Sequence, residues 1–150
     1  MRLGDYKKIM IATDGSDCSK VAIGKGIELA RLSGGTVYAV NVISTAYLSP
    51  RSGGWELIHE ELKNQGQQAV DYIKRLGEVK GINVESVLLE GNPSDELSRY
   101  ADEEKMDIVI MGTLGKTGLY RMLLGSVAGN MIRHSKVPVM VVREEGEPQD

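Results

Sequence analysis

The stretch KKIMIATDGSDCSKVAIGKGIELARLSGG, residues 7–35, contains two successive patterns that together decide the fold. Its first part is a short apolar run of β-type side chains, which predicts a strand over residues 7–15. In the remainder, apolar side chains recur at helical spacing, at Val21, Ile27, Leu29 and Leu32. Ser16 or Asp17 can cap the start of this helix, and Gly34 and Gly35 can supply the left-handed residue that commonly ends one. A strand followed at once by a helix is typical of α/β proteins.

The same order of strand and helix continues along the chain. Apolar runs predict further strands at TVYAVNVI (36–43), INVESVLLEG (82–91), MDIVIMG (106–112) and VPVMVV (137–142). A long amphipathic helix is predicted from Glu56 to about Lys80, with its apolar side chains at Ile58, Leu62, Ala69, Ile73 and Leu76. Shorter helices are predicted within NPSDELSRYADEEK (92–105), capped by Ser94, and from about Val127 to Ser135. The intervening segment 44–55, rich in Ser, Pro and Gly, is expected to be an irregular loop.

Two of the predicted strands end in turns whose residues could bind a ligand. The first ends at Asp14, Gly15 and Ser16, and the fourth ends at Gly112. In open parallel sheets the ligand crevice lies beyond the carboxyl ends of the strands, where the strand order reverses. Placing these two strands side by side gives the order 3-2-1-4-5. The prediction is therefore a doubly wound, Rossmann-like α/β fold, in which a parallel sheet of five strands has helices on both faces.

Composition indicates one domain over residues 1–150, with an acidic tail, 144–150, that is expected to be disordered. A net charge of −3 with scattered Lys and Arg argues against a nucleic-acid binder. No apolar run approaches the roughly 20 residues of a membrane span, and the start MRLGDYKK lacks the apolar core of a signal peptide, so we expect a cytoplasmic protein without membrane contact. The single cysteine, Cys18, is interpreted as a small buried filler rather than a redox sensor.

The fourth strand leads into GTLGKTGLYRMLLGS, residues 112–126, in which glycines stand at both ends of an apolar loop. The embedded GKT is not a phosphate loop of the Walker type, because Ile110 stands where that motif needs its first glycine. Gly112 and Gly115 would let backbone N–H groups approach an anion without an intervening side chain. The loop therefore predicts a phosphate site built from the main chain.

The end of this loop opens a helix, and the start of a helix is itself an anion site. The free amides of Ser126, Val127 and Ala128 would point at phosphate oxygens with a partial positive charge, and Ser126 would add a hydroxyl. Lys116 and Arg121 could neutralise phosphate, although a lone cation on a loop is more often solvated. The apolar middle of the loop would pin it to the domain or to a partner subunit.

At these residues the chain resembles the universal stress protein family, whose nucleotide-binding members carry Gly, two residues, Gly, nine residues, then Gly and Ser or Thr. Gly112, Gly115, Gly125 and Ser126 fit that spacing. The segments DGSDCS after the first strand and GSVAGNMIRHSKVPVMVV near the end also resemble the family. The resemblance implies an ATP-binding, flavodoxin-like domain that forms homodimers.

The resemblance further implies the roles of individual residues. Asp14 and the turn at Val42 would help to hold ribose and adenine, although Asp14 could instead be a helix-capping acid. The glycines and Ser126 would hold the triphosphate of ATP, or the phosphates of ADP or AMP, together with Mg²⁺ or Mn²⁺. Leu114 departs from the polar or basic side chain of many relatives, and Ala12 from the proline of some. The candidate site comprises Ala12, Thr13, Asp14, Val42, Met111, Gly112, Gly115, Lys116, Gly125, Ser126 and Val127, with no catalytic residue and no direct metal ligand.

No catalytic base is aimed at this site. At roughly 1.5 Å per residue, His134 lies about 12 Å along the last helix from Ser126, and His59 belongs to another helix. Backbone donors bind phosphate well but activate water poorly, which favours a nucleotide-dependent sensor or switch in the stress response. One alternative is a slow ATPase or nucleotidyl-transferring enzyme, in which Asp14 or a bound metal activates the nucleophile. A second is a dimerisation module without nucleotide.

The last predicted strand, Val137–Val142, lies at an edge of the predicted sheet. Its valines alternate with other apolar residues, so both of its faces are apolar and little charge protects the edge. Such an edge invites pairing, and a twofold partner could place its own last strand alongside. We therefore expect a homodimer through this strand.

Overall fold

The computed structural model of the chain describes residues 2–45, 53–113 and 124–143. Its strands form one parallel sheet of five strands in the order β3-β2-β1-β4-β5. The strands are β1 (Lys8–Ala12), β2 (Thr36–Ser44), β3 (Val84–Gly91), β4 (Ile108–Gly112) and β5 (Val139–Val142). The predicted order is confirmed, and each strand falls on its predicted run, with β2 one residue longer.

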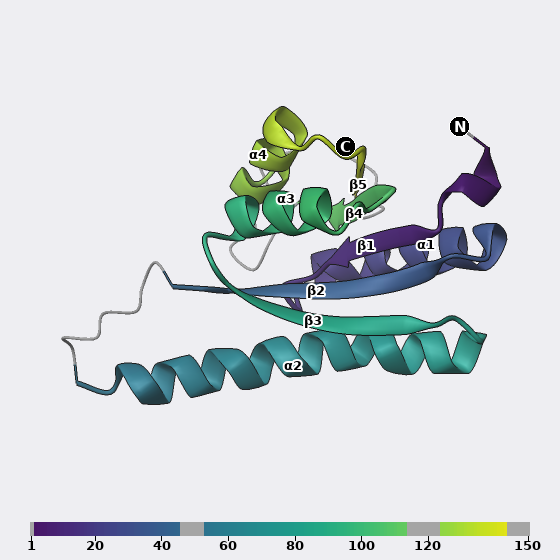
Figure 1. Cartoon of the computed structure of the whole chain (residues 1–150). Coiled ribbons are helices and arrows are strands. Elements are labelled where there is room, and N and C mark those ends of the chain that lie inside the picture. The colour runs from purple at the N-terminus through teal and green to yellow at the C-terminus, as the bar shows by residue number, and fades with distance from the viewer. Residues whose placement is uncertain (1, 46–52, 114–123, 144–150) are drawn as a thin grey trace, which may run out of the picture.

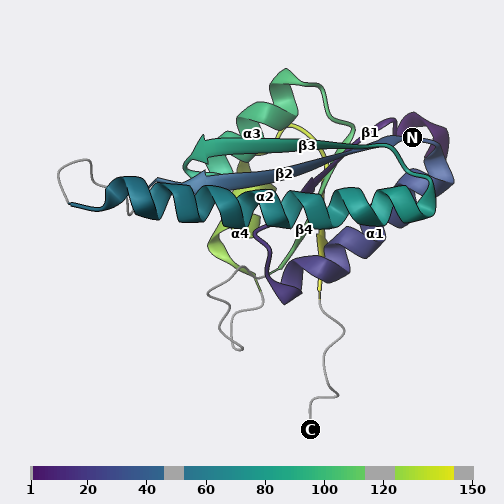
Figure 2. The same cartoon turned by 90° about the horizontal axis from the view of Figure 1, so that it is seen from below.

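Helices cover both faces of this sheet, as predicted (Figure 1). They are α1 (Asp17–Ser33), α2 (Trp55–Lys80), α3 (Pro93–Glu103) and α4 (Ser126–His134), preceded by a short 3₁₀ helix, η1 (Leu3–Asp5). Figure 2 shows α1 and α2 side by side on one face of the sheet, and α3 and α4 lie on the other. The first turns of α2 project beyond the strands in Figure 1. Consequently Ile58, predicted on the apolar face of this helix, is 52% exposed.

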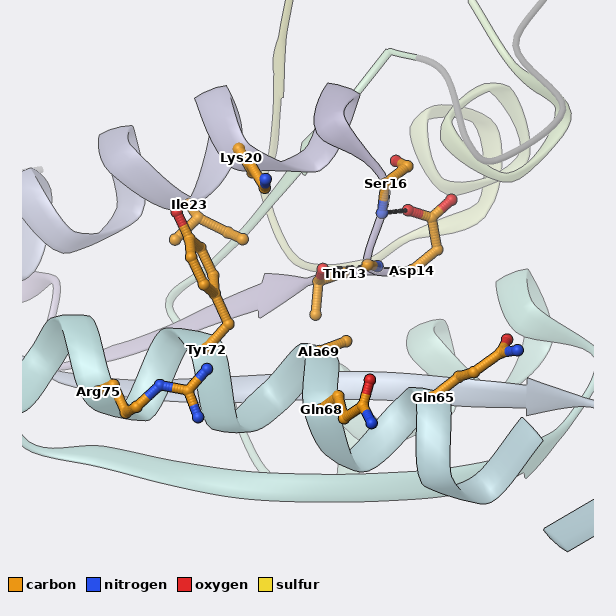
Figure 3. Close-up of a pocket in the computed structure, with 11 residues that line it drawn as sticks. Thr13, Asp14, Ser16, Lys20, Ile23, Gln65, Gln68, Ala69, Tyr72 and Arg75 are labelled. Carbon is orange, nitrogen blue, oxygen red and sulfur yellow. Dashed lines mark hydrogen bonds between the residues drawn. The ribbon is translucent and has the colours of Figure 1, made fainter. Parts of the chain in front are cut away.

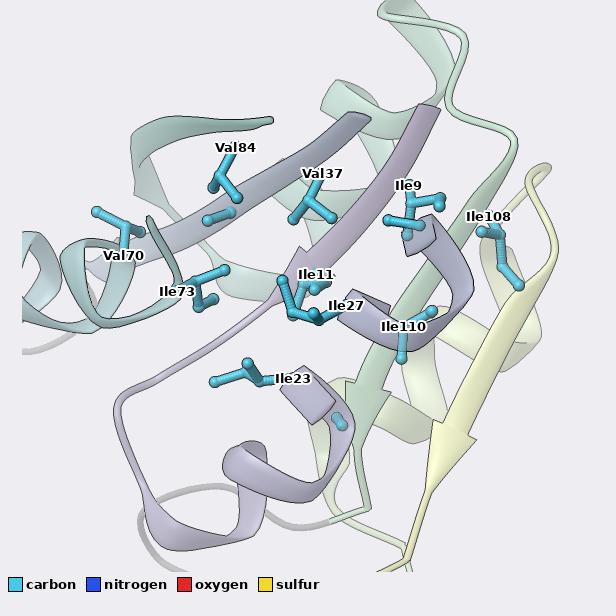
Figure 4. Packing of buried hydrophobic residues seen from close by; sticks show 13 residues of the cluster. Ile9, Ile11, Ile23, Ile27, Val37, Val70, Ile73, Val84, Ile108 and Ile110 are labelled. Atoms are coloured by element: carbon cyan, nitrogen blue, oxygen red, sulfur yellow. The ribbon is translucent and has the colours of Figure 1, made fainter. Parts of the chain in front are cut away.

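The strands send alternate side chains into two cores that differ in composition. The isoleucine core, under α1 and α2, consists of Ile9, Ile11, Ala22, Ile23, Ile27, Ala30, Val37, Ala39, Val70, Ile73, Val84, Ile108 and Ile110 (Figure 4). The methionine core, under α3 and α4, consists of Met10, Ala12, Val40, Leu97, Ala101, Met106, Val109, Met111, Ala128 and Met131. Successive side chains of a strand point to opposite faces of the sheet, and here both faces are covered by helices. Successive residues are therefore mostly apolar, which is why the strands read as continuous apolar runs.

The ends of the helices follow from local residues. Ser16 is the N-cap residue of α1, and Gly34 ends that helix with a left-handed φ of 72°, as predicted. The predicted cap of α3 is wrong, because Asn92 rather than Ser94 occupies that position, and the Asn92 side chain accepts the N–H of Asp95. Proline favours the first helical position, so Pro93 makes the preceding residue the cap and puts Ser94 inside the helix.

Candidate functional site

The carboxyl ends of β1 and β4 lie next to each other at one edge of the sheet. The two strands pair in parallel, with Ile11 beside Ile110. This is the point at which the strand order reverses, because β2 continues on one side of β1 and β4 on the other. The turn after β1 and the segment after β4 therefore leave the sheet together, as the sequence predicts.

The turn after β1 is fixed by hydrogen bonds to β2. The N–H of Thr13 donates to the carbonyl of Val40, and Nδ2 of Asn41 donates to the carbonyl of Thr13, each at 2.9 Å. Asn41 is only 7% exposed, so this second bond is shielded from water. The N–H of Gly15, whose φ of 81° favours glycine, donates to Oγ1 of Thr13 at 3.1 Å. The chain thus leaves the sheet in a defined direction, with Asp14 at the bend.

Asp14 has a structural role in this turn. Its Oδ1 accepts the N–H of Ser16 at 2.9 Å and the hydroxyl of Ser19 at 3.2 Å, which closes the turn that leads into α1. The alternative of a capping acid is therefore supported for one carboxylate oxygen. The side chain is half-buried at the mouth of the sheet, close to where the predicted nucleotide would lie.

The two ends of the glycine-rich stretch meet in space. The N–H of Gly125, just before α4, donates to the carbonyl of Thr113, just after β4, at 2.6 Å. A Cβ added at Gly112 would lie 2.8 Å from the carbonyl oxygen of Cys18, so the first turn of α1 packs directly on the end of β4. The starts of α1 and α4 consequently flank the end of β4.

The start of α4 has no side-chain cap among the residues that the structure describes. Its N-cap residue is Gly125, which has an extended backbone and no side chain that could accept the first amides of the helix. These amides have no partner within a helix, and they carry its positive dipole end. Ser126 is exposed at this start, and Val127 is half-buried. The arrangement can therefore receive an anion from outside the helix.

The apolar candidates gather on one side of the sheet. Ala12 and Met111 belong to the methionine core, and Val42 and Val127 pack against it. These four residues belong to four different elements, β1, β4, β2 and α4, which meet on this side of the sheet. The remaining candidates Gly115 and Lys116, together with Leu114 and Arg121, lie outside the described residues.

A pocket of about 370 Å³ lies on the opposite side of the turn after β1, between α1 and α2 (Figure 3). We call it the α1–α2 groove. It is lined by the turn from Thr13 to Ser16, by Lys20 and Ile23 of α1, and by Gln65, Gln68, Ala69, Tyr72 and Arg75 of α2. Of the predicted site residues within the described ranges, Thr13 and Asp14 line it. Sequence reasoning missed the others because α1 and α2 are distant in the chain, although Tyr72 and Arg75 share a helix face by their spacing.

The two histidines lie away from the ends of β1 and β4. Nε2 of His59, on α2, is 2.7 Å from Oε1 of Glu90, on β3. His134 is the last residue of α4, at the opposite end from Gly125. Across residues 2–45, 53–113 and 124–143, no group of three or more His, Cys, Asp or Glu side chains could hold a metal ion. Within the same ranges, every helix is too short or too polar to cross a membrane.

Comparisons with known proteins agree with this fold. The model of the universal stress protein family matches residues 5–143. The universal stress protein MJ0531 of Methanocaldococcus jannaschii is 43% identical over 141 residues, which are 93% of this chain and 83% of that protein.

Solved structures show the same similarity. The structure of MJ0577 from the same organism matches with a TM-score of 0.85 at 31% identity, over 95% of this chain and 99% of that one. A universal stress protein solved in complex with cAMP matches with a TM-score of 0.66 at 28% identity, over 92% of this chain and 97% of that one.

Proposed function

The chain belongs to the universal stress protein family, and we propose that it binds ATP with a divalent ion and acts as a nucleotide-dependent sensor or switch in the stress response. One observation carries the proposal. The bond of 2.6 Å between Gly125 and Thr113 holds the uncapped start of α4 against the end of β4, beside the turn of Asp14. Unpaired helix amides at the switch point of a parallel sheet suit a phosphate. The relative solved with cAMP supports an adenine nucleotide as the ligand.

The proposed contacts divide by the parts of the nucleotide. The half-buried carboxylate of Asp14 would accept hydrogen bonds from ribose hydroxyls, as an acidic side chain does in related sheets. Adenine would lie along the apolar side chains of Ala12, Val42 and Met111, next to Thr13. The phosphates would accept hydrogen bonds from the amides and the hydroxyl at the start of α4. The residues proposed to contact the phosphates are Gly112, Gly115, Lys116, Gly125, Ser126 and Val127.

The divalent ion, Mg²⁺ or Mn²⁺, would come with the nucleotide. The described residues offer no cluster of three His, Cys, Asp or Glu side chains for the ion. Oxygen ligands from phosphate and water suit both ions. When bound, the ion would neutralise phosphate charge, to which the carboxylate of Asp14 adds a further negative charge.

Binding is favoured over turnover by the placement of the two histidines. His59 is engaged with Glu90, and His134 lies at the far end of α4. Timed phosphate release from purified protein with ATP and Mg²⁺ tests the slow-ATPase alternative. We expect release at the background rate, whereas turnover that disappears in Gly125→Ala would favour an enzyme.

We also propose a homodimer through β5. This strand is the edge of the sheet next to β4. Met140 on β5 and Ile132 on α4 are 40% and 52% exposed, which leaves apolar side chains beside an unpaired strand edge. A second copy could continue the sheet there and cover them.

The central experiment is calorimetric titration of ATP with Mg²⁺ into Ser126→Glu. A carboxylate in the first turn of a helix is favourable for that helix, and the same charge repels phosphate. We therefore expect ATP binding to be lost while the thermal unfolding midpoint is unchanged or higher. Ser126→Ala is the matched control and should weaken binding only modestly.

A second measurement identifies the nucleotide. Small molecules released by denaturing the purified protein are separated and weighed by mass spectrometry. ATP, ADP or AMP should be present with the natural chain and absent with Ser126→Glu. If neither copurification nor titration detects an adenine nucleotide, the dimerisation module without nucleotide is the better description.

A further inference from the structure

The geometry points to the α1–α2 groove as a second small-molecule site, for a flat apolar body that carries a carboxylate or phosphate. Its volume of about 370 Å³ falls within the roughly 300–1,000 Å³ typical of ligand pockets. This assignment goes beyond the proposed function, because it concerns the other side of the turn after β1.

The floor and one wall of the groove are apolar. Ile23 and Ala69 are buried, at 2% and 7% exposed, and present aliphatic surface from α1 and α2. The ring of Tyr72 extends from α2 toward Ile23 and closes one side (Figure 3). The ammonium of Lys20 lies 5.6 Å from the centroid of this ring. An aromatic ligand face could therefore stack against Tyr72 and contact Ile23 and Ala69.

The polar rim favours an anion. Arg75 lines the groove, and its guanidinium makes no hydrogen bond or ion pair with any other residue in the described ranges. Lys20 is paired with Asp17 at 3.1 Å, but both side chains are more than half exposed, and such pairs are weak. Asp14, the carboxylate among the lining residues, directs Oδ1 to Ser16 and Ser19. Two cations thus face the groove, and one has a planar donor fork suited to carboxylate or phosphate.

The groove and the proposed nucleotide site are separated by the sheet and share only one turn. Ile23 belongs to the isoleucine core, whereas Ala12 and Met111 belong to the methionine core on the other face. Gly112, Gly125 and Ser126 do not line the groove. An occupant beside Tyr72 would leave the start of α4 free, so both ligands could bind together.

The test uses 2-naphthoate as the probe and 2-naphthamide as its neutral match, on the full chain freed of nucleotide. We expect 2-naphthoate to shift the amide resonances of Gly15, Gln68 and Ala69, and 2-naphthamide to bind about tenfold more weakly, because it lacks the charge for Arg75. Arg75→Gln should weaken 2-naphthoate by a similar factor. Lys74→Gln removes the same charge from the adjacent residue, which does not line the groove, and should have no effect.

Two further arms keep the result decisive. Gln68→Glu, an exposed change, puts a carboxylate into the groove and should weaken 2-naphthoate without unfolding the chain. Equal binding of the two probes, equal loss in Arg75→Gln and Lys74→Gln, or resonance shifts confined to other surfaces would overturn the assignment. Competition between 2-naphthoate and ATP would also overturn it, since the groove would then belong to the nucleotide site. Absence of ATP binding with 2-naphthoate retained would contradict the proposed function alone.

Discussion

At the scale of single residues, Gly112 has a structural explanation that needs no ligand. The sequence suggests that this glycine lets backbone amides approach a phosphate. The structure adds that a side chain here would press on the carbonyl of Cys18, 2.8 Å from an added Cβ. The backbone of Gly125 has a φ of −71°, which is open to any residue, so its conformation alone does not require glycine.

Gly112→Ala tests this structural reason. The added methyl group cannot move away from a backbone carbonyl without shifting α1, so we expect the unfolding free energy to fall by about 1–3 kcal/mol. Gly24→Ala is the control, because an added Cβ there meets nothing within 4 Å on the surface of α1. It should raise stability by up to about 1 kcal/mol through helix propensity. Urea unfolding measures both, and a fully stable Gly112→Ala would contradict the packing argument.

Asp14 also combines two roles that substitution can separate. Asp14→Asn keeps a side-chain oxygen for the N–H of Ser16, so stability should change by no more than about 0.5 kcal/mol. ATP affinity should fall about tenfold, because the carboxylate proposed to bind ribose is lost. Asp14→Ala loses both roles and should cost about 0.5–2 kcal/mol as well, like a lost cap. Unchanged ATP affinity in Asp14→Asn would limit this residue to the turn.

At the scale of elements, the sequence predicts those features of the helices and strands that depend on residues close together in the chain. Strand and helix alternation, the strand order and the left-handed end of α1 at Gly34 all follow from local patterns and chain topology. The contacts between distant elements do not. Glycine is unfavourable in the middle of a helix by propensity alone. At Gly66 of α2, however, an added Cβ would lie 2.5 Å from Oδ1 of Asn41 on β2.

The candidate site divides in the same way. The turn of Asp14 and the start of α4 could be located from glycine spacing, and their juxtaposition from the strand order. The bond from Asn41 that fixes the turn could not, because it joins residues 28 positions apart. The α1–α2 groove depends likewise on how two helices pack side by side. Sequence periodicity describes the face of one helix but not the partner that it meets.

A double-mutant cycle measures the contact between α2 and β2. Gly66→Ala alone should lower the unfolding free energy by about 1–3 kcal/mol, because its methyl group meets Asn41. Asn41→Ala alone should cost about 1–3 kcal/mol, because it leaves the carbonyl of Thr13 without its buried donor. In the Asn41→Ala background, Gly66→Ala should cost much less, because the added Cβ then meets chiefly Cδ2 of Leu88, at 3.3 Å. Strictly additive effects would show that the two residues do not interact.

At the scale of the whole molecule, the sheet has two unlike edges. The long helix α2 packs on the face of β2 and β3, whereas β5 is a short strand with Met140 exposed on it. An unpaired apolar edge is a liability for a monomer and an asset for a symmetric dimer. The proposed dimer therefore continues the sheet from β5 rather than from β3.

Met140→Glu tests the dimer by light scattering coupled to size exclusion. The residue is 40% exposed, so the change should leave the monomer folded while it places charges together across a twofold axis. We expect dimers for the natural chain and monomers for this variant at micromolar concentration. Val79→Glu, at an 83% exposed apolar position on α2, is the control and should stay dimeric. A natural chain that is monomeric at this concentration would contradict the dimer proposal.

The unequal composition of the two cores has a practical consequence for spectroscopy. All the methionines of the described cores lie beneath α3 and α4, and all the isoleucines lie beneath α1 and α2. Carbon-13 labelling of methionine methyl groups would therefore report from the half of the protein that carries the start of α4. Methyl labels on the buried isoleucines of the isoleucine core would report from the half that borders the groove, whereas Ile132 on α4 would not. Two samples, one with each label, could thus follow the two halves of the protein separately while ATP or 2-naphthoate is titrated.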